Sequence, residues 1–300
     1  MRGSGVPEDL VRVFEYWYGN QSNCVKWGDT TSNSYRLECG VRQGGLTSPD
    51  LFNLYVNDLM GRLRGTGVGC HVGDVCINSL SYADDMVLLS PSIKGLRKLV
   101  SVCENYVNSH GLIYNVAKTE LMIFKAGRGP ENIPEVKLNG EKLRIVQRFK
   151  YLGHILTDDM RDDSDIERER RALAVRGNMI ARRFAGCSRG VKYTLFNAYC
   201  LSFYTCQLWV RYSRKSYGTI RVQYNNIFRT LLGLPRSCSA STMFAEARIP
   251  DFFAVVRARI ASFWEGMRRS HNTILMSVYR NINCNMFRHW LSVHENENKK

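Results

Sequence analysis

The chain has 300 residues, 44% of them hydrophobic and 23% charged, a composition that excludes an intrinsically disordered or collagen-like protein. Its ten cysteines follow no regular spacing, and no signal peptide is recognisable, so we expect reduced thiols in an intracellular protein, nuclear or cytoplasmic. The net charge of +15 points to a polyanionic partner.

The first predicted elements are two helices joined by strands and a glycine-rich segment. Residues 7–18 carry apolar side chains at helical spacing, and strand-like runs follow at 23–27 and 34–38. In the segment Gly40-Val41-Arg42-Gln43-Gly44 the glycines allow a ligand to approach the backbone closely, although an ordinary loop before a helix is the alternative. Ser48 is expected to cap a helix whose first turn contains Pro49.

Two adjacent carboxylates, Asp84 and Asp85, stand between apolar runs in the segment that begins Ser79-Leu80-Ser81-Tyr82-Ala83. Like charges repel at close range and apolar surroundings raise the cost of ionising both, so a cation is expected nearby. The alternation on both sides predicts two strands joined by a tight turn. A carboxylate pair at a hairpin tip suits Mg²⁺, whereas a solvated acidic turn is the alternative.

The chain then continues as mixed helix and strand up to about residue 160. Residues 96–107 predict a helix that ends before Gly111. Strand-like runs follow at 112–115, 120–124, 136–138, 143–146 and 149–156. Lys118 is expected in a turn between two of these strands.

The second half is predicted to be helical and basic. The pattern Ser164-Asp165-Ile166-Glu167 resembles a capping box at a helix start, and helical periodicity continues to about residue 291. Residues 193–210 carry no charge, but their polar side chains favour a buried core helix over a membrane span. Residues 1–159 hold 18 basic and 17 acidic side chains, whereas residues 160–300 hold 24 and 10.

Arginine makes up most of this basic surplus, and it suits bidentate phosphate contacts. Aromatic residues lie between the arginines, which favours nucleic acid over a membrane surface. The candidate nucleic-acid-binding residues are Arg176, Arg182, Arg183, Arg211, Arg214, Lys215, Arg257, Arg259, Arg268 and Arg269. Cys284, His289 and His294 suggest a zinc module only loosely, since a fourth ligand would have to come from Cys238 or His271.

Four motifs in a fixed order resemble the reverse transcriptases of non-LTR (LINE-type) retrotransposons. They are the Gly40–Gly44 segment with Ser48-Pro49 and Leu51-Phe52, then Tyr82-Ala83-Asp84-Asp85, then Gly111-Leu112 with Asn115 and Lys118-Thr119-Glu120, then Phe149-Lys150-Tyr151-Leu152-Gly153. The resemblance covers about residues 5–160 closely and the basic remainder more loosely. It implies an α+β fold: a partial polymerase palm over residues 1–160, with an antiparallel sheet and packed helices, followed by an all-helical thumb and C-terminal extension over 161–300.

The resemblance also implies a role for each motif. Asp84 and Asp85 would bind Mg²⁺ or Mn²⁺, two ions in the complete family site, with Asp84 bridging them and Asp85 supporting. Arg42, Gln43, Gly44, Tyr82, Ala83 and Lys118 would line the nucleotide and template pocket. Tyr151, Leu152 and Gly153 would grip the primer, although apolar strand residues also suit a core. The partners would be an RNA template, a DNA primer and deoxynucleoside triphosphates, and no membrane.

One family feature has no counterpart here. The family carries an earlier block in which an Asp supplies a third metal-binding carboxylate and a nearby Phe selects the sugar, and neither Asp9 nor Asp29 fits it. We therefore expect a polymerase portion without fingers and first catalytic block, whose autonomous activity is lower by orders of magnitude. The alternative is a basic nucleic-acid-binding remnant without chemistry.

Overall fold

The computed structural model describes residues 5–124, 132–281 and 283–295, and side chains up to Val293. The chain divides into two compact units, Met1–His71 with Cys76–Ile113, and Val72–Val75 with Tyr114–Lys300. Both helices and strands are present, as the predicted α+β class requires. The chain changes from mixed to helical structure after residue 160, but the assignment of a palm and a thumb remains a prediction.

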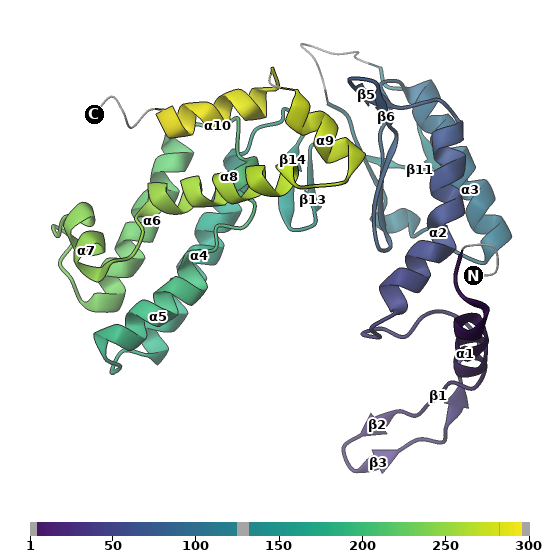
Figure 1. The fold of residues 1–300 in the computed structure, drawn as a ribbon, viewed down its shortest axis with the longest axis horizontal. Helices are drawn as coiled ribbons and strands as arrows, with labels where there is room; N and C mark the ends of the chain where they lie inside the picture. Colours follow the sequence, from purple (N-terminus) through teal and green to yellow (C-terminus); the bar gives the residue numbers. More distant parts are fainter. Residues whose placement is uncertain (1–4, 125–131, 282, 296–300) are drawn as a thin grey trace. The chain divides into compact units, whose positions relative to one another are not determined.

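The elements up to residue 113 are short hairpins and three described helices (Figure 1). They are α1 (Glu8–Gly19), β1 (Ser22–Asn23), β2 (Lys26–Trp27), β3 (Thr30–Thr31), β4 (Tyr35–Arg36), α2 (Ser48–Gly65), β5 (Cys70–Val72), β6 (Val75–Ile77), β7 (Ser79–Tyr82), β8 (Asp85–Leu88) and α3 (Ile93–His110). The core of the first unit lies between α2 and α3, where Leu59, Leu63, Leu99 and Tyr106 are buried. The Tyr106 hydroxyl donates to the backbone oxygen of Tyr55 at 2.5 Å, which ties the two helices together.

The second unit begins with short strands and continues as a helical bundle (Figure 1). Its elements are η1 (Val116–Lys118), β9 (Glu120–Met122), β10 (Lys137–Leu138), β11 (Glu141–Lys142), β12 (Arg144–Val146), β13 (Arg148–Tyr151), β14 (His154–Thr157), α4 (Asp163–Arg183), α5 (Arg189–Cys200), η2 (Cys206–Leu208), α6 (Arg214–Leu232), α7 (Ala240–Ala247), α8 (Phe252–Arg268), α9 (Thr273–Arg280) and α10 (Asn285–Glu295).

The described strands pair two by two and do not form one continuous sheet. The pairs β1–β4, β2–β3, β5–β6, β7–β8, β10–β11 and β13–β14 accompany the pair β9–β12. The β9–β12 pair is parallel, with Ile145 opposite Leu121. The expected antiparallel sheet is therefore present only as separate antiparallel pairs of short strands, each two to four residues long, beside one parallel pair.

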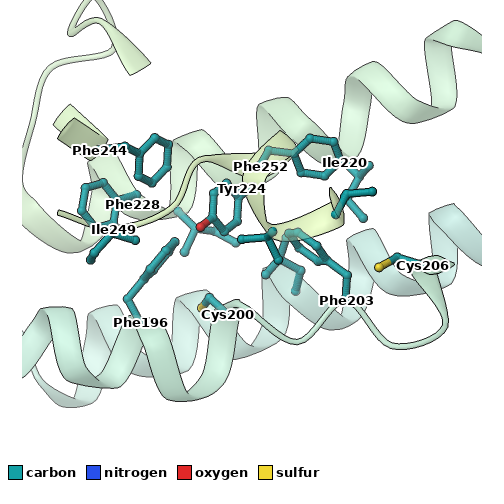
Figure 2. Close-up of a cluster of buried hydrophobic side chains, with 14 of the residues drawn as sticks. Phe196, Cys200, Phe203, Cys206, Ile220, Tyr224, Phe228, Phe244, Ile249 and Phe252 are labelled. Atoms are coloured by element: carbon teal, nitrogen blue, oxygen red, sulfur yellow. The ribbon is translucent and has the colours of Figure 1, made fainter. Parts of the chain in front are cut away.

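An aromatic cluster forms the core of the helical bundle. Figure 2 shows Phe196 of α5, Tyr224 and Phe228 of α6, Phe244 of α7 and Phe252 of α8 meeting around a common centre. The rings of Phe228 and Phe244 stack with centroids 4.8 Å apart. The Tyr224 hydroxyl donates to the Pro250 carbonyl at 2.8 Å, so its polar end is satisfied despite burial.

Several local predictions need correction. Residues 112–115 form no strand, since Gly111 in the left-handed conformation ends α3 and Asn115 already caps η1. The uncharged segment 193–210 is not one helix, because α5 ends at Cys200 and Thr205 adopts a φ of 65° before η2 begins. Within the described ranges no helix has the length and apolarity of a membrane span. All ten cysteines lie in those ranges and are free thiols.

Gly177 of α4 allows the close contact between α4 and α6. A Cβ there would lie 2.5 to 2.8 Å from three carbon atoms of the Ile227 side chain. We expect Gly177→Ala to lower the free energy of unfolding by about 1–2 kcal/mol, because overpacking outweighs the gain in helix propensity. At Gly266 of α8 no atom lies within 4 Å of such a Cβ, so Gly266→Ala is expected to add about 0.5–1 kcal/mol. Urea unfolding of both variants measures whether each substitution raises or lowers the free energy of unfolding. If both variants were stabilised equally, the packing argument at Gly177 would be contradicted.

Candidate functional site

The acidic motif lies at the end of a hairpin, as predicted. Strands β7 and β8 pair in register from Ser79 opposite Leu88 to Tyr82 opposite Asp85, which leaves Ala83 and Asp84 as the turn. Ala83 has a φ of 51° at the first turn position, where two-residue hairpins usually need glycine. The turn is therefore strained, as backbone at functional sites often is, and it carries the consecutive residues Asp84 and Asp85 at the tip.

The base of this hairpin is fixed to the end of α2. Buried Asn78 donates from its amide to the backbone oxygens of Leu63 at 2.7 Å and Val68 at 2.9 Å. The Leu89 N–H donates to the backbone oxygen of Asn78 at 2.8 Å, which closes the hairpin. The two carboxylates consequently project from a rigid support, which suits a group that must hold a fixed position.

Asp84 and Asp85 are exposed, and in the described part of the chain neither forms an ion pair. Two neighbouring carboxylates are hard oxygen donors, which fit Mg²⁺ or Mn²⁺ better than softer metals. Among the described residues no three ligating side chains gather in one place, so this hairpin offers two carboxylates and no third. Any further ligands of a bound ion have to come from water, from the phosphates of a bound molecule or from side chains outside this hairpin.

The segment Gly40–Gly45 forms a tight loop before α2. The Ser48 hydroxyl donates to the Arg42 oxygen at 2.6 Å, and the Gly45 N–H donates to the same oxygen at 3.0 Å. Ser48 is thus the first residue of α2 and not its cap, because its side chain closes the loop. Gln43 and Gly44 are exposed, and no hydrogen bond among the described residues joins Arg42, Gln43 or Gly44 to the acidic hairpin.

Lys118 is the last residue of η1, and Thr119 separates it from β9, so it does not lie in a turn between two strands. Its N–H donates to the Asn115 side chain at 3.1 Å, and its own side chain is exposed. Lys118 belongs to the second unit, whereas Asp84 and Asp85 belong to the first. Its role at the nucleotide remains a prediction.

The proposed primer-grip residues form the second hairpin of interest, β13–β14. Tyr151 pairs with His154, and Leu152 and Gly153 form the turn with φ angles of 45° and 85°. Positive φ at both positions matches the type I′ turn of two-residue hairpins. The Ile155 N–H donates to the Asp165 carboxylate at 3.0 Å, which joins the hairpin to α4.

Asp165 is the centre of a buried charge network that the sequence did not reveal. Its carboxylate, fully buried, accepts hydrogen bonds from Arg168, from the Trp209 indole at 2.8 Å and from the Ile155 N–H. His154 lies 3.2 Å away. Burial alone would raise the pKa of Asp165, but the hydrogen bonds from His154, Arg168 and Trp209 hold this pKa well below its usual range.

The same network includes Glu169, which is fully buried and pairs with Arg168 at 3.0 Å and Arg176 at 2.5 Å. The expected capping box is absent, since Ser164 accepts from Arg148 and Glu167 pairs with Arg170. Asp165, Glu169 and Leu173 recur every four residues on one helix face, but two carboxylates at this spacing are typical of an exposed face, so the local pattern did not indicate their burial.

The candidate arginines divide into engaged and exposed groups. Arg176 is half-buried in its ion pair, while Arg268 and Arg269 pair with Glu265 on the surface. The exposed candidates are Arg182, Arg183, Arg211, Arg214, Lys215 and Arg259, and Arg257 is half-buried. A groove of about 540 Å³ between α4 and α6 is lined by four basic side chains, those of Arg170, Arg214, Lys215 and Arg221, together with Glu167.

The loose zinc hypothesis gains no support from the described residues. The Cys284 sulfur accepts the Phe287 N–H at the start of α10, and the His289 ring contacts the Tyr212 hydroxyl at 3.3 Å. The His294 side chain lies outside the described residues. Cys284 and His289 therefore have structural contacts that account for their positions.

Comparison with known proteins places these motifs in a family. A family model described as "Reverse transcriptase (RNA-dependent DNA polymerase)" matches residues 5–156. The chain is 31% identical over 122 residues to a Pol polyprotein from the type-1 retrotransposable element R2 of Popillia japonica, which covers 38% of this chain and 17% of that protein. It is 22% identical over 280 residues to the RNA-directed DNA polymerase from mobile element jockey of Drosophila funebris, 89% of this chain and 30% of that protein. The chain thus spans less than a third of the length of these relatives.

Proposed function

Because the chain belongs to the reverse transcriptase (RNA-dependent DNA polymerase) family, in the form found in non-LTR retrotransposons, we propose that it carries the metal-binding and primer-positioning hairpins of such a polymerase. The observation that carries the proposal is the pair of exposed carboxylates, Asp84 and Asp85, on a hairpin fixed to α2. A carboxylate pair so held suits an ion that must be presented to a substrate rather than sequestered.

Each motif has a distinct task in this proposal. Asp84 and Asp85 hold the divalent ions, which when bound stabilise the attacking and leaving oxygens of nucleotidyl transfer. The loop with Arg42, Gln43 and Gly44 faces the nucleotide and template together with Tyr82 and Ala83, and Lys118 offers a positive charge to the leaving phosphates. The turn of Tyr151, Leu152 and Gly153 positions the 3′ end of the primer.

The helical region binds the RNA template and DNA primer through their phosphates. Support comes from the charge surplus of residues 160–300 and from the exposed side chains Arg182, Arg183, Arg211, Arg214 and Lys215. Contacts of this kind read the backbone and carry no sequence information. This thumb-like role is compatible with a catalytic protein and equally with a binding protein that performs no chemistry.

We expect the 300-residue chain to add a template-directed deoxynucleotide only slowly, and Asp84→Asn to reduce that addition by at least about 100-fold. The reason is that two carboxylates bind and place the ions poorly, while neutralising one of them removes most of what remains. The measurement is single-nucleotide incorporation on an RNA template with a DNA primer and Mn²⁺. Asp74→Asn is the matched control, because Asp74 is an exposed carboxylate in the turn of another hairpin, β5–β6.

The outcomes separate the two functions. Incorporation that follows the template base and is lost only in Asp84→Asn supports the polymerase. Incorporation that survives Asp84→Asn contradicts the assigned site. If the wild type and both variants bind primer–template but show no incorporation above background, the result favours the non-catalytic binding protein. The absence of a third ligating side chain among the described residues is the observation on the side of that alternative.

A further inference from the structure

Tyr204, in the loop between α5 and η2, contacts the turn of the β13–β14 hairpin. Its hydroxyl donates a hydrogen bond of 2.6 Å to the backbone oxygen of Leu152. Its ring lies against Gly153, where a Cβ would approach the Tyr204 Cε1 atom to 2.9 Å. The turn therefore cannot tilt or shift without losing both contacts.

Tyr204 is itself held in place by the buried charge network. The Arg168 guanidinium lies 5.7 Å from the centre of the Tyr204 ring and donates to the Tyr204 backbone oxygen at 3.1 Å. The Thr205 hydroxyl lies 2.6 Å from the same oxygen and 3.0 Å from the Asp165 carboxylate. Arg168 is in turn fixed by Asp165 and Glu169.

The backbone on both sides of this contact is strained. Thr205 has a φ of 65°, which is unusual for a β-branched residue, and Leu152 has a φ of 45°. Such conformations cost free energy and persist only where the surroundings determine them, as they do at many functional sites. Thr205 directly follows Tyr204 in the chain, so this unusual backbone lies next to the residue that contacts the turn.

Core packing does not account for the arrangement. Tyr204 is 52% exposed and Leu152 is 40% exposed, so their contact buries little apolar surface. We propose that Tyr204 is a positioning residue that sets the direction in which the Tyr151–Leu152–Gly153 turn meets the 3′ end of the primer. The inference rests on the proposed function, which assigns the primer end to that turn.

The test uses the full chain bound to an RNA template and a DNA primer that carries a photoreactive 4-thiothymidine at its 3′ end. We expect the wild type to crosslink within residues 148–157. Tyr204→Phe removes only the hydroxyl contact, and we expect it to lower this crosslink by about three- to ten-fold while total binding stays unchanged. Tyr204→Ala removes the ring as well and should lower it further. Tyr199→Phe is the matched control, because Tyr199 is a similarly exposed tyrosine, at 47%, on α5.

A second photoreactive base in the middle of the primer serves as an internal control. A general loss of structure would lower crosslinking at this base and at the 3′ end to the same extent. A fall at the 3′ end alone supports positioning by Tyr204. If crosslinking falls equally at the 3′ end and in the middle of the primer, or stays at the wild-type level in Tyr204→Phe and Tyr204→Ala, the role of Tyr204 is overturned. The assignment of the primer end to the Tyr151–Leu152–Gly153 turn is then unaffected. Wild-type crosslinks outside residues 148–157 overturn the primer turn itself, and the inference with it. Circular dichroism confirms that each variant is folded.

Discussion

Replacing Asp165 with asparagine is expected to lower the free energy of unfolding of the helical unit by about 3–5 kcal/mol, because it breaks a buried, fully hydrogen-bonded charge network. Both carboxylate oxygens accept from N–H groups, one from Ile155 and Arg168 and the other from Arg168 and Trp209. An asparagine has only one carbonyl oxygen, so either orientation turns its NH₂ group toward N–H donors. Urea unfolding monitored by circular dichroism measures the loss.

Glu167→Gln is the matched control for this prediction. It is the same kind of substitution two residues away on α4, but Glu167 is 39% exposed and pairs with Arg170 and Arg171 at the surface. We expect it to cost less than about 1 kcal/mol. Similar losses in the two variants would show that burial of Asp165 does not decide the outcome.

The dependence of stability on pH gives a second readout of the same substitution. The pKa of Asp165 is lowered in the folded chain, since its hydrogen bonds outweigh the effect of burial. Its contribution is therefore present above the pKa of an unfolded aspartate, about 3.9, and is lost as the pH falls further toward the folded pKa. In Asp165→Asn the decline of the free energy of unfolding below about pH 4 should be shallower than in the wild type. If the decline is unchanged, other carboxylates are responsible for the loss of stability in acid.

Raising the salt concentration from 50 to 200 mM is expected to weaken binding of the chain to an RNA–DNA primer–template by a few hundred-fold. With about five phosphates neutralised, the slope of log affinity against log salt is about −4 to −5, at roughly −0.9 per contact. The expectation follows from the charge of residues 160–300 and from the basic groove between α4 and α6. Fluorescence anisotropy titrations at several salt concentrations give the slope directly.

Charge reversal locates this binding. The double variant Arg214→Glu, Lys215→Glu changes two exposed side chains at the groove. We expect it to bind primer–template more weakly, and its slope of log affinity against log salt to be shallower by the amount that about two phosphate contacts contribute. Arg64→Glu with Lys94→Glu makes the same change in net charge on exposed residues of the first unit. Equal effects of the two pairs, or binding that does not respond to salt, would contradict a nucleic-acid-gripping role for the C-terminal helices.

Local patterns predicted the parts of this structure that local physics decides. The acidic hairpin and the glycine that ends α3 follow from alternation, capping and turn chemistry over a few residues. The start of α4 near residue 163 was also predicted, although the capping box that suggested it does not form. The Asp165 network was not predicted, because its partners His154, Thr205 and Trp209 lie 11 to 44 residues away in the chain. Read locally, Asp165 resembled a residue of an exposed first helical turn.

The end of α5 at Cys200 escaped prediction for a related reason. Residues 193–210 have no proline or glycine, so no local signal interrupts the helix. The tertiary contacts of Thr205 with Asp165 and of Tyr204 with Leu152 form only if the chain leaves the helix there. Tertiary structure overrides helix propensity at this point.

The attachment of the β13–β14 hairpin to α4 has a consequence for movement along a template. The Ile155 N–H is hydrogen-bonded to Asp165 of α4, and the Leu152 oxygen is hydrogen-bonded to Tyr204. The Leu152–Gly153 turn and the arginines of α4 and α6 are therefore parts of the same compact unit and should move together. On the proposed function, advancing the duplex by one nucleotide cannot release the primer end first and the phosphates later. The contacts to the primer end and the contacts to the phosphates have to break and re-form in the same step. The number of nucleotides copied before the enzyme dissociates should therefore depend on salt as steeply as binding does.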